Sequence, residues 1–100
     1  MPKAWLDMER IDRWYTENQG HESALKVIET LGTAMCRLET FPDSGVLVNN
    51  RELKSLNWRQ INCRPYVIFY KKEDKIVKIH RIIDTRREDP FVLLRDGAED

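Results

Sequence analysis

The sequence predicts an α+β fold, with an N-terminal helical hairpin packed on one face of a three- to four-stranded antiparallel sheet. Three observations predict it. Two helical patterns come first, strand-like segments follow, and no long linker or internal repeat interrupts them. One hundred residues are the length of one domain, so we expect a single domain over residues 1–100.

Two amphipathic helical patterns occupy residues 3–18 and 22–40. In the second, apolar residues recur at the i, i+3, i+4, i+7 spacing of a buried helix face, at Ala24, Val27, Ile28, Leu31, Met35 and Leu38. The first has a stripe of the same kind at Ala4, Met8, Ile11 and Tyr15. Only a few residues around Gly20 separate the two, which predicts an antiparallel hairpin. Pro42 ends the second helix, and a turn follows it.

Three strands are predicted after this turn, at residues 51–62, 65–72 and 75–83. The last two segments are rich in Val, Ile, Tyr and Phe, whereas the first is supported by apolar residues at Leu53, Leu56, Trp58 and Ile61. Residues 46–50 are interpreted as a loop or a short extended piece. Residues 88–100 form a C-terminal tail whose apolar run, residues 91–94, either closes the core or pairs as a short strand.

Composition excludes several classes of protein. No apolar run approaches the roughly 20 residues that span a bilayer, and the N-terminus lacks the apolar core of a signal peptide, so we expect a cytoplasmic protein without membrane contact. Cys36 and Cys63 have no metal-ligand spacing and are interpreted as reduced thiols. The motifs HExxH, CxxC and GxSxG are absent, and we expect neither a metal nor a cofactor.

Positive charge is concentrated between Arg51 and Arg87. This segment contains eleven Lys and Arg but only four Asp and Glu, although the net charge of the chain is 0. Arginine beside aromatic side chains suits phosphate and base contacts, and equally the docking of an acidic protein segment. The candidate binding residues are therefore Arg51, Arg64, Arg81, Arg86, Arg87, Trp58, Tyr66 and Tyr70. The alternative is a solvated basic face, with Arg81 paired internally with an acid.

A catalytic site is not evident. The candidates are Arg87, Arg81 and His80, none of which belongs to a nucleophile–base motif. A lone histidine in the middle of a strand is more often structural than catalytic. An arginine can stabilise a developing negative charge, but RNA cleavage also needs a base and an acid.

Five short motifs, in order and at fitting spacings, resemble the RelE/ParE toxin superfamily. They are Ala4-x-x-Asp7-Met8-x-x-Ile11, Leu38-x-x-Phe41-Pro42-x-x-Gly45, Arg51-Glu52-Leu53, the run from Pro65 to Tyr70, and Ile79-x-Arg81-Ile82-Ile83-x-x-x-Arg87. The resemblance implies the toxin of a type II toxin–antitoxin pair, a class also known as plasmid stabilisation proteins. It further implies a small antitoxin partner that wraps the toxin. The chain itself is expected to form a homodimer or a hetero-oligomer with this antitoxin.

The resemblance is nearer to the ParE type, which implies a growth inhibitor that binds a protein target such as DNA gyrase. This interpretation favours a protein that is not an enzyme. The alternative is a RelE-like, ribosome-dependent mRNA endonuclease, and a second alternative is an inactive family member that binds only its antitoxin. A net charge of 0 disfavours a ribosome binder, because basic surface supplies most nonspecific RNA affinity.

Three departures from the superfamily pattern bear on these alternatives. The usual first strand before the first helix is missing, which predicts an open sheet edge that a partner could cover. Asp84 stands where His is common. The nucleases place a basic residue after the strand tyrosine and a Tyr or His near the C-terminus, whereas here Val67 and the apolar residues 91–94 occupy these places. Arg87 does match a nuclease arginine.

Overall fold

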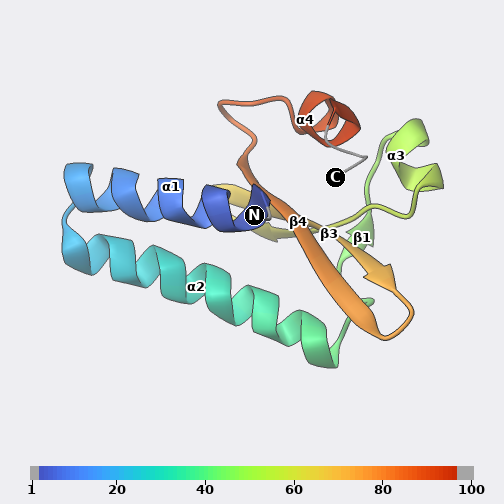
Figure 1. Ribbon diagram of the computed structural model, residues 1–100, viewed down its shortest axis with the longest axis horizontal. Helices are drawn as coiled ribbons and strands as arrows, with labels where there is room; N and C mark the ends of the chain where they lie inside the picture. The colour runs from blue at the N-terminus through green and yellow to red at the C-terminus, as the bar shows by residue number, and fades with distance from the viewer. Residues whose placement is uncertain (1–2, 97–100) are drawn as a thin grey trace.

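The computed structural model describes residues 3–96 (Figure 1). A helical hairpin followed by an antiparallel sheet appears in the predicted order, and the α+β fold is confirmed. The elements are α1 (Lys3–Asn18), α2 (His21–Thr40), β1 (Val46–Leu47), α3 (Arg51–Ser55), β2 (Arg59–Cys63), β3 (Tyr66–Glu73), β4 (Ile76–Asp84) and α4 (Pro90–Asp96). None of the helices among these residues is long and apolar enough to cross a membrane.

The four strands form one antiparallel sheet in the order β1-β2-β3-β4. The predicted hairpin of α1 and α2 packs along one face of it, and α3 and α4 lie toward the other side (Figure 1). A register shift in the β3–β4 pair, where Phe69 faces Arg81 but Tyr70 faces Ile79, leaves His80 as an extra residue on β4. Within residues 3–96, β4 pairs with β3 alone and is therefore an edge strand.

Both faces of the sheet are covered by apolar clusters. Between the helical hairpin and the sheet lie Ile11, Leu31, Tyr66, Ile68 and Ile82. On the opposite face lie Val48, Leu53, Trp58, Phe69, Ile83 and Leu94. A sheet covered on both faces explains why β3 and β4 are apolar on both sides of the strand instead of alternating with polar residues.

One predicted element is corrected by the structure, and for a second the structure decides between the two alternatives. The strand predicted at 51–62 is wrong in its first half, because Arg51–Ser55 is the helix α3 and the strand begins only at Arg59. The Asn50 side chain caps this helix by accepting a hydrogen bond of 3.2 Å from the Leu53 backbone N–H. In the tail, residues 91–94 are part of helix α4, and buried Leu94 closes the core. Residues 97–100 of the predicted tail lie outside the described range.

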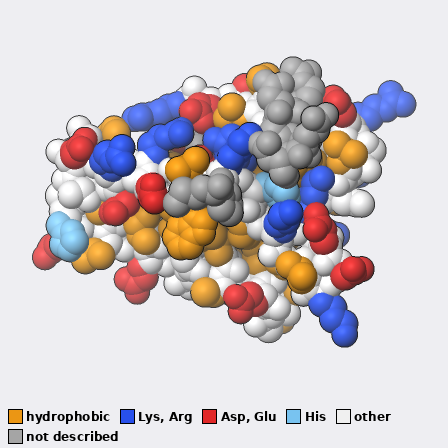
Figure 2. Space-filling view, viewed as in Figure 1, with side chains coloured by type: hydrophobic (Ala, Val, Ile, Leu, Met, Phe, Trp, Pro, Cys, Tyr) orange, Lys and Arg blue, Asp and Glu red, His pale blue; other side chains and the backbone are white. Residues whose placement is uncertain are grey.

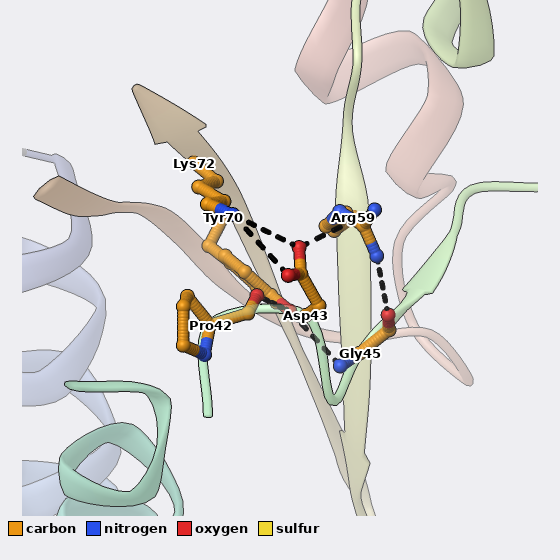
Figure 3. A network of polar contacts seen from close by, with 6 residues as sticks. All are labelled: Pro42, Asp43, Gly45, Arg59, Tyr70 and Lys72. Carbon is orange, nitrogen blue, oxygen red and sulfur yellow. Dashed lines mark hydrogen bonds and ion pairs between the residues drawn. The ribbon is translucent and has the colours of Figure 1, made fainter. Parts of the chain in front are cut away.

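A polar network joins the turn after α2 to the sheet (Figure 3). The Tyr70 hydroxyl donates to the Pro42 carbonyl at 2.9 Å and accepts from the Gly45 backbone N–H at 3.0 Å. Arg59 Nη1 donates to the Gly45 carbonyl at 2.8 Å. A Cβ at Gly45 would collide with the Tyr70 ring and hydroxyl, so this close approach requires glycine. The network therefore gives the Pro-x-x-Gly motif a structural role, which is to fix the turn after α2 against Tyr70 of β3.

Candidate functional site

A buried ion pair anchors α1 to β4. Asp7, only 4% exposed, accepts hydrogen bonds from Arg81 Nε at 2.8 Å and Arg81 Nη2 at 3.0 Å. The same carboxylate accepts the Ile82 backbone N–H at 2.9 Å, which satisfies one polar group at the edge of the sheet. The hydrogen bond with Asp7 raises the pKa of Arg81. Arg81 is thus committed to an internal pair, as the alternative interpretation of the basic stretch predicted.

Two exposed arginines gather around Asp84, the last residue of β4. Its Oδ1 accepts from the backbone N–H of Arg86 at 3.0 Å and from Arg86 Nε at 3.1 Å, and its Oδ2 accepts from Arg86 Nη2 at 3.1 Å. Arg87 Nε lies 3.8 Å from Oδ2. The hydrogen bond from Arg86 lowers the pKa of Asp84. Both arginine side chains remain more than 60% exposed, so Asp84 orients them at the surface without covering them.

These arginines border a cleft of about 160 Å³ between α1 and the segment that follows β4. We call it the α1–β4 cleft, and its lining consists of Asp7, Arg10, Ile11, Trp14, Tyr15, Tyr66, Ile82, Asp84, Arg86, Arg87 and Glu88. Figure 2 shows Lys and Arg side chains gathered above α1, toward the connection from β4 to α4. The cleft thus combines guanidinium groups with an apolar and aromatic floor.

The aromatic wall of the cleft is ordered by contacts among its own side chains. The rings of Trp14 and Tyr15 meet edge-to-face at a centroid distance of 5.0 Å, and the Arg87 guanidinium carbon lies 5.3 Å from the Trp14 ring centroid. Burial first, and then a hydrogen bond with Tyr15, raises the pKa of Tyr66. The Tyr66 phenol therefore keeps its proton at neutral pH and is a poor general base.

A family model described as "ParE toxin of type II toxin-antitoxin system, parDE" matches residues 1–89. The chain belongs to this ParE toxin family. The predicted membership of the RelE/ParE superfamily, nearer the ParE type, is therefore confirmed. No protein with a curated function matches the chain.

The fold of this ParE family member is similar to a solved structure titled "Chromosomal ParDE TA system from P. aeruginosa". The TM-score is 0.69, with 20% sequence identity over 84% of this chain and 89% of that one. At that identity the likeness concerns the fold, an open antiparallel sheet with a helical hairpin on one face.

The predicted binding residues of the ParE chain do not form one surface. Arg86, Arg87 and Tyr66 meet at the α1–β4 cleft. Arg51 is exposed at the start of α3, and Arg64 borders a separate cavity of about 130 Å³ beside α2. Trp58 is 1% exposed and Tyr70 is 0% exposed. Their side chains belong to the core and to the turn network, so neither is accessible to a partner in this structure.

Sequence reasoning missed the contribution of α1 to this site. Arg10, Trp14 and Tyr15 line the cleft, yet the sequence presents them only as parts of a helix far from the basic stretch. The available signal was Trp14 itself, an aromatic residue that widens the predicted apolar stripe of this helix beyond Ile11 and Tyr15. Only the packing of α1 against β4 shows that this ring lies beside Arg87.

The catalytic candidates of the ParE chain are also separated. His80 packs edge-to-face on Trp58 at a centroid distance of 4.6 Å, and its Nε2 is buried with no hydrogen-bond partner among the described residues. Trp58 belongs to the cluster on the face opposite the helical hairpin, whereas Arg87 borders the cleft beside α1. His80 is not part of the cleft lining, so the structure does not place an imidazole beside Arg87.

His80 predicts a pH dependence of stability in this ParE chain. Burial lowers the pKa of His80 below its ordinary 6.5, and the positive charges of Lys71 and Lys78 lower it further. The negative charge of Glu73 acts in the opposite direction. The imidazole of the unfolded chain therefore binds a proton more readily than that of the folded chain. The free energy of unfolding has its full value above about pH 6.5 and decreases as the pH falls below that value. Urea unfolding at about pH 7.5 and 5.5 should show a smaller decrease for His80→Gln than for the natural chain. An equal decrease in both would contradict this role of His80.

Proposed function

We propose that the chain is a ParE-type toxin that inhibits growth by binding a protein target, DNA gyrase, without a catalytic step of its own. Its antitoxin neutralises it by forming a hetero-oligomer, and both act in the cytoplasm. The observation that carries this proposal is the presentation of Arg86 and Arg87 at a partly apolar cleft, oriented by Asp84. Oriented arginines beside aromatic side chains are typical anchors of protein interfaces.

The runner-up function is mRNA cleavage on the ribosome. It requires a base for the 2′-OH, a cation for the phosphorane and an acid for the leaving oxygen. Arg87 could serve as the cation, but His80 packs on Trp58 and the raised pKa of Tyr66 disfavours a phenolate base. This arrangement, together with a net charge of 0, favours docking over cleavage.

The test compares two activities of the purified chain. We expect it to inhibit supercoiling by purified gyrase and to leave mRNA uncut in a ribosome-dependent translation reaction. The double variant Arg86→Gln/Arg87→Gln should weaken the inhibition at least about tenfold, since interface arginines are frequent hot spots. Arg13→Gln is the matched control, because it removes one positive charge from the exposed face of α1 outside the cleft lining.

Three other results would redirect the proposal. mRNA cleavage without any effect on gyrase would establish the nuclease alternative. If neither activity nor growth arrest occurs, the chain is an inactive family member that binds only its antitoxin. Coexpression with the adjoining reading frame should restore growth and yield a co-purifying complex, and failure on both counts would contradict the antitoxin part of the proposal.

A further inference from the structure

We infer that the α1–β4 cleft binds a peptide segment that presents one carboxylate next to an apolar side chain. The carboxylate would lie between Arg10 and Arg87, and the apolar side chain would enter against Trp14. This inference deepens the proposed function, since it rests on a toxin that acts by binding protein. It specifies the site and the chemistry of the partner segment.

The cations at the cleft have capacity for a further anion. Arg81 donates hydrogen bonds to Asp7 through two guanidinium nitrogens, and Arg86 donates to Asp84 in the same way. Among the described residues, the one ion-pair contact of Arg87 is the 3.8 Å approach of its Nε to Asp84, and its guanidinium also lies over the Trp14 ring. Arg10 makes no ion pair within the described residues, although it borders the same cleft. A partner carboxylate would therefore gain charge-assisted hydrogen bonds without breaking the buried pair.

The floor of the cleft suits an apolar group of side-chain size. Ile11 and Ile82 are 7% and 4% exposed and close its base, whereas the Trp14 side chain is 38% exposed at its wall. A volume of about 160 Å³ is smaller than the roughly 300–1,000 Å³ of typical small-molecule pockets. The space fits a single anchoring side chain, and filling it would remove exposed aromatic surface from water.

The charge of the lining favours a single carboxylate over a nucleic acid. Asp84 and Glu88 stand beside the arginines, and Glu9 and Asp12 lie on the same helix as Arg10. A phosphate backbone carries one charge per nucleotide on each strand, so it would place further charges against these acids. A single carboxylate, by contrast, requires hydrogen bonds from Arg10 and Arg87 only. A protein segment is therefore the occupant that the cleft complements.

The probe is the capped dipeptide acetyl-Leu-Asp-amide, titrated into the ¹⁵N-labelled full chain. We expect the Trp14 indole N–H and the Arg87 Nε–H resonances to shift, with a Kd on the order of millimolar for so small a ligand. Acetyl-Leu-Asn-amide should bind at least about fivefold more weakly, because it lacks the charge. Arg87→Gln and Trp14→Ala should each weaken binding of the Asp peptide by a similar factor.

The controls are matched on the same helix. Trp5→Ala removes a tryptophan that is 61% exposed, and Arg13→Gln an exposed arginine, and both should bind the Asp peptide like the natural chain. Equal binding of the Asn peptide, absence of any shift, or tighter binding of the dinucleotide pTpT would each overturn the inference. The titration does not involve gyrase, so peptide binding without gyrase inhibition refutes the proposed target while the cleft assignment stands.

Discussion

Asp7→Ala is expected to lower the free energy of unfolding by about 3–5 kcal/mol, because it leaves a buried charge without its partner. The Arg81 side chain is only 14% exposed and would lose both of its hydrogen bonds to the carboxylate. The Ile82 backbone N–H would lose its acceptor at the same time. Urea unfolding followed by circular dichroism measures the change.

Two further variants make this prediction specific to the pair. Asp12→Ala, on the exposed side of the same helix, should change stability by no more than about 0.5 kcal/mol. The double variant Asp7→Leu/Arg81→Met should recover a large part of the loss, since a buried pair can often be replaced by apolar residues. A loss below about 1 kcal/mol for Asp7→Ala would mean that the pair behaves as a surface salt bridge.

Trp58→Ala is expected to cost about 3–5 kcal/mol, the range of large-to-small substitutions of buried aromatic residues. The indole is 1% exposed and packs with Val48, Leu53 and Phe69 in the cluster that joins β3 and β4 to α3 and α4. Its removal would leave a cavity under α3 and would also withdraw the ring on which His80 packs. Thermal and urea unfolding should both show the loss.

The controls for Trp58 separate burial from residue type. Trp5→Ala should have little effect on stability, because Trp5 is 61% exposed. Trp58→Phe should cost less than Trp58→Ala, since Trp58 Nε1 has no hydrogen-bond partner among the described residues to lose. If Trp58→Ala leaves stability unchanged and abolishes antitoxin binding, the contact role predicted from sequence would replace the core role described above.

Asp7 also explains how the fold positions the cleft. Its ion pair holds the first turns of α1 against the end of β4, across 74 positions of sequence. Arg10 and Trp14 follow Asp7 at one-turn spacing on α1, so they lie on the same side of the helix and border the cleft. The buried pair is therefore a structural requirement for the cleft that we propose as the binding surface, although Arg81 is not free to contact a partner itself.

Local patterns predicted most of the secondary structure. The α2 stripe and the apolar character of β3 and β4 follow from periodicity and side-chain type, which depend on neighbouring residues only. Helix α3 was missed because it has five residues and is stabilised by the Asn50 cap and by burial of Leu53, not by a periodic stripe. Helix α4 presents the same difficulty, since an apolar run as short as residues 91–94 suits a strand as well as a helix.

The sequence by itself determined the fold class and the toxin family, and it predicted Arg86 and Arg87 as binding residues, because each of these depends on local patterns and motif order. It could not tell exposed aromatic residues from buried ones, and so it assigned Trp58 and Tyr70 to a binding face and left out Trp14. Burial depends on contacts between distant segments, as in the network that joins Tyr70 to Pro42 and Gly45. Only the tertiary structure brings α1 beside the end of β4 and creates the cleft.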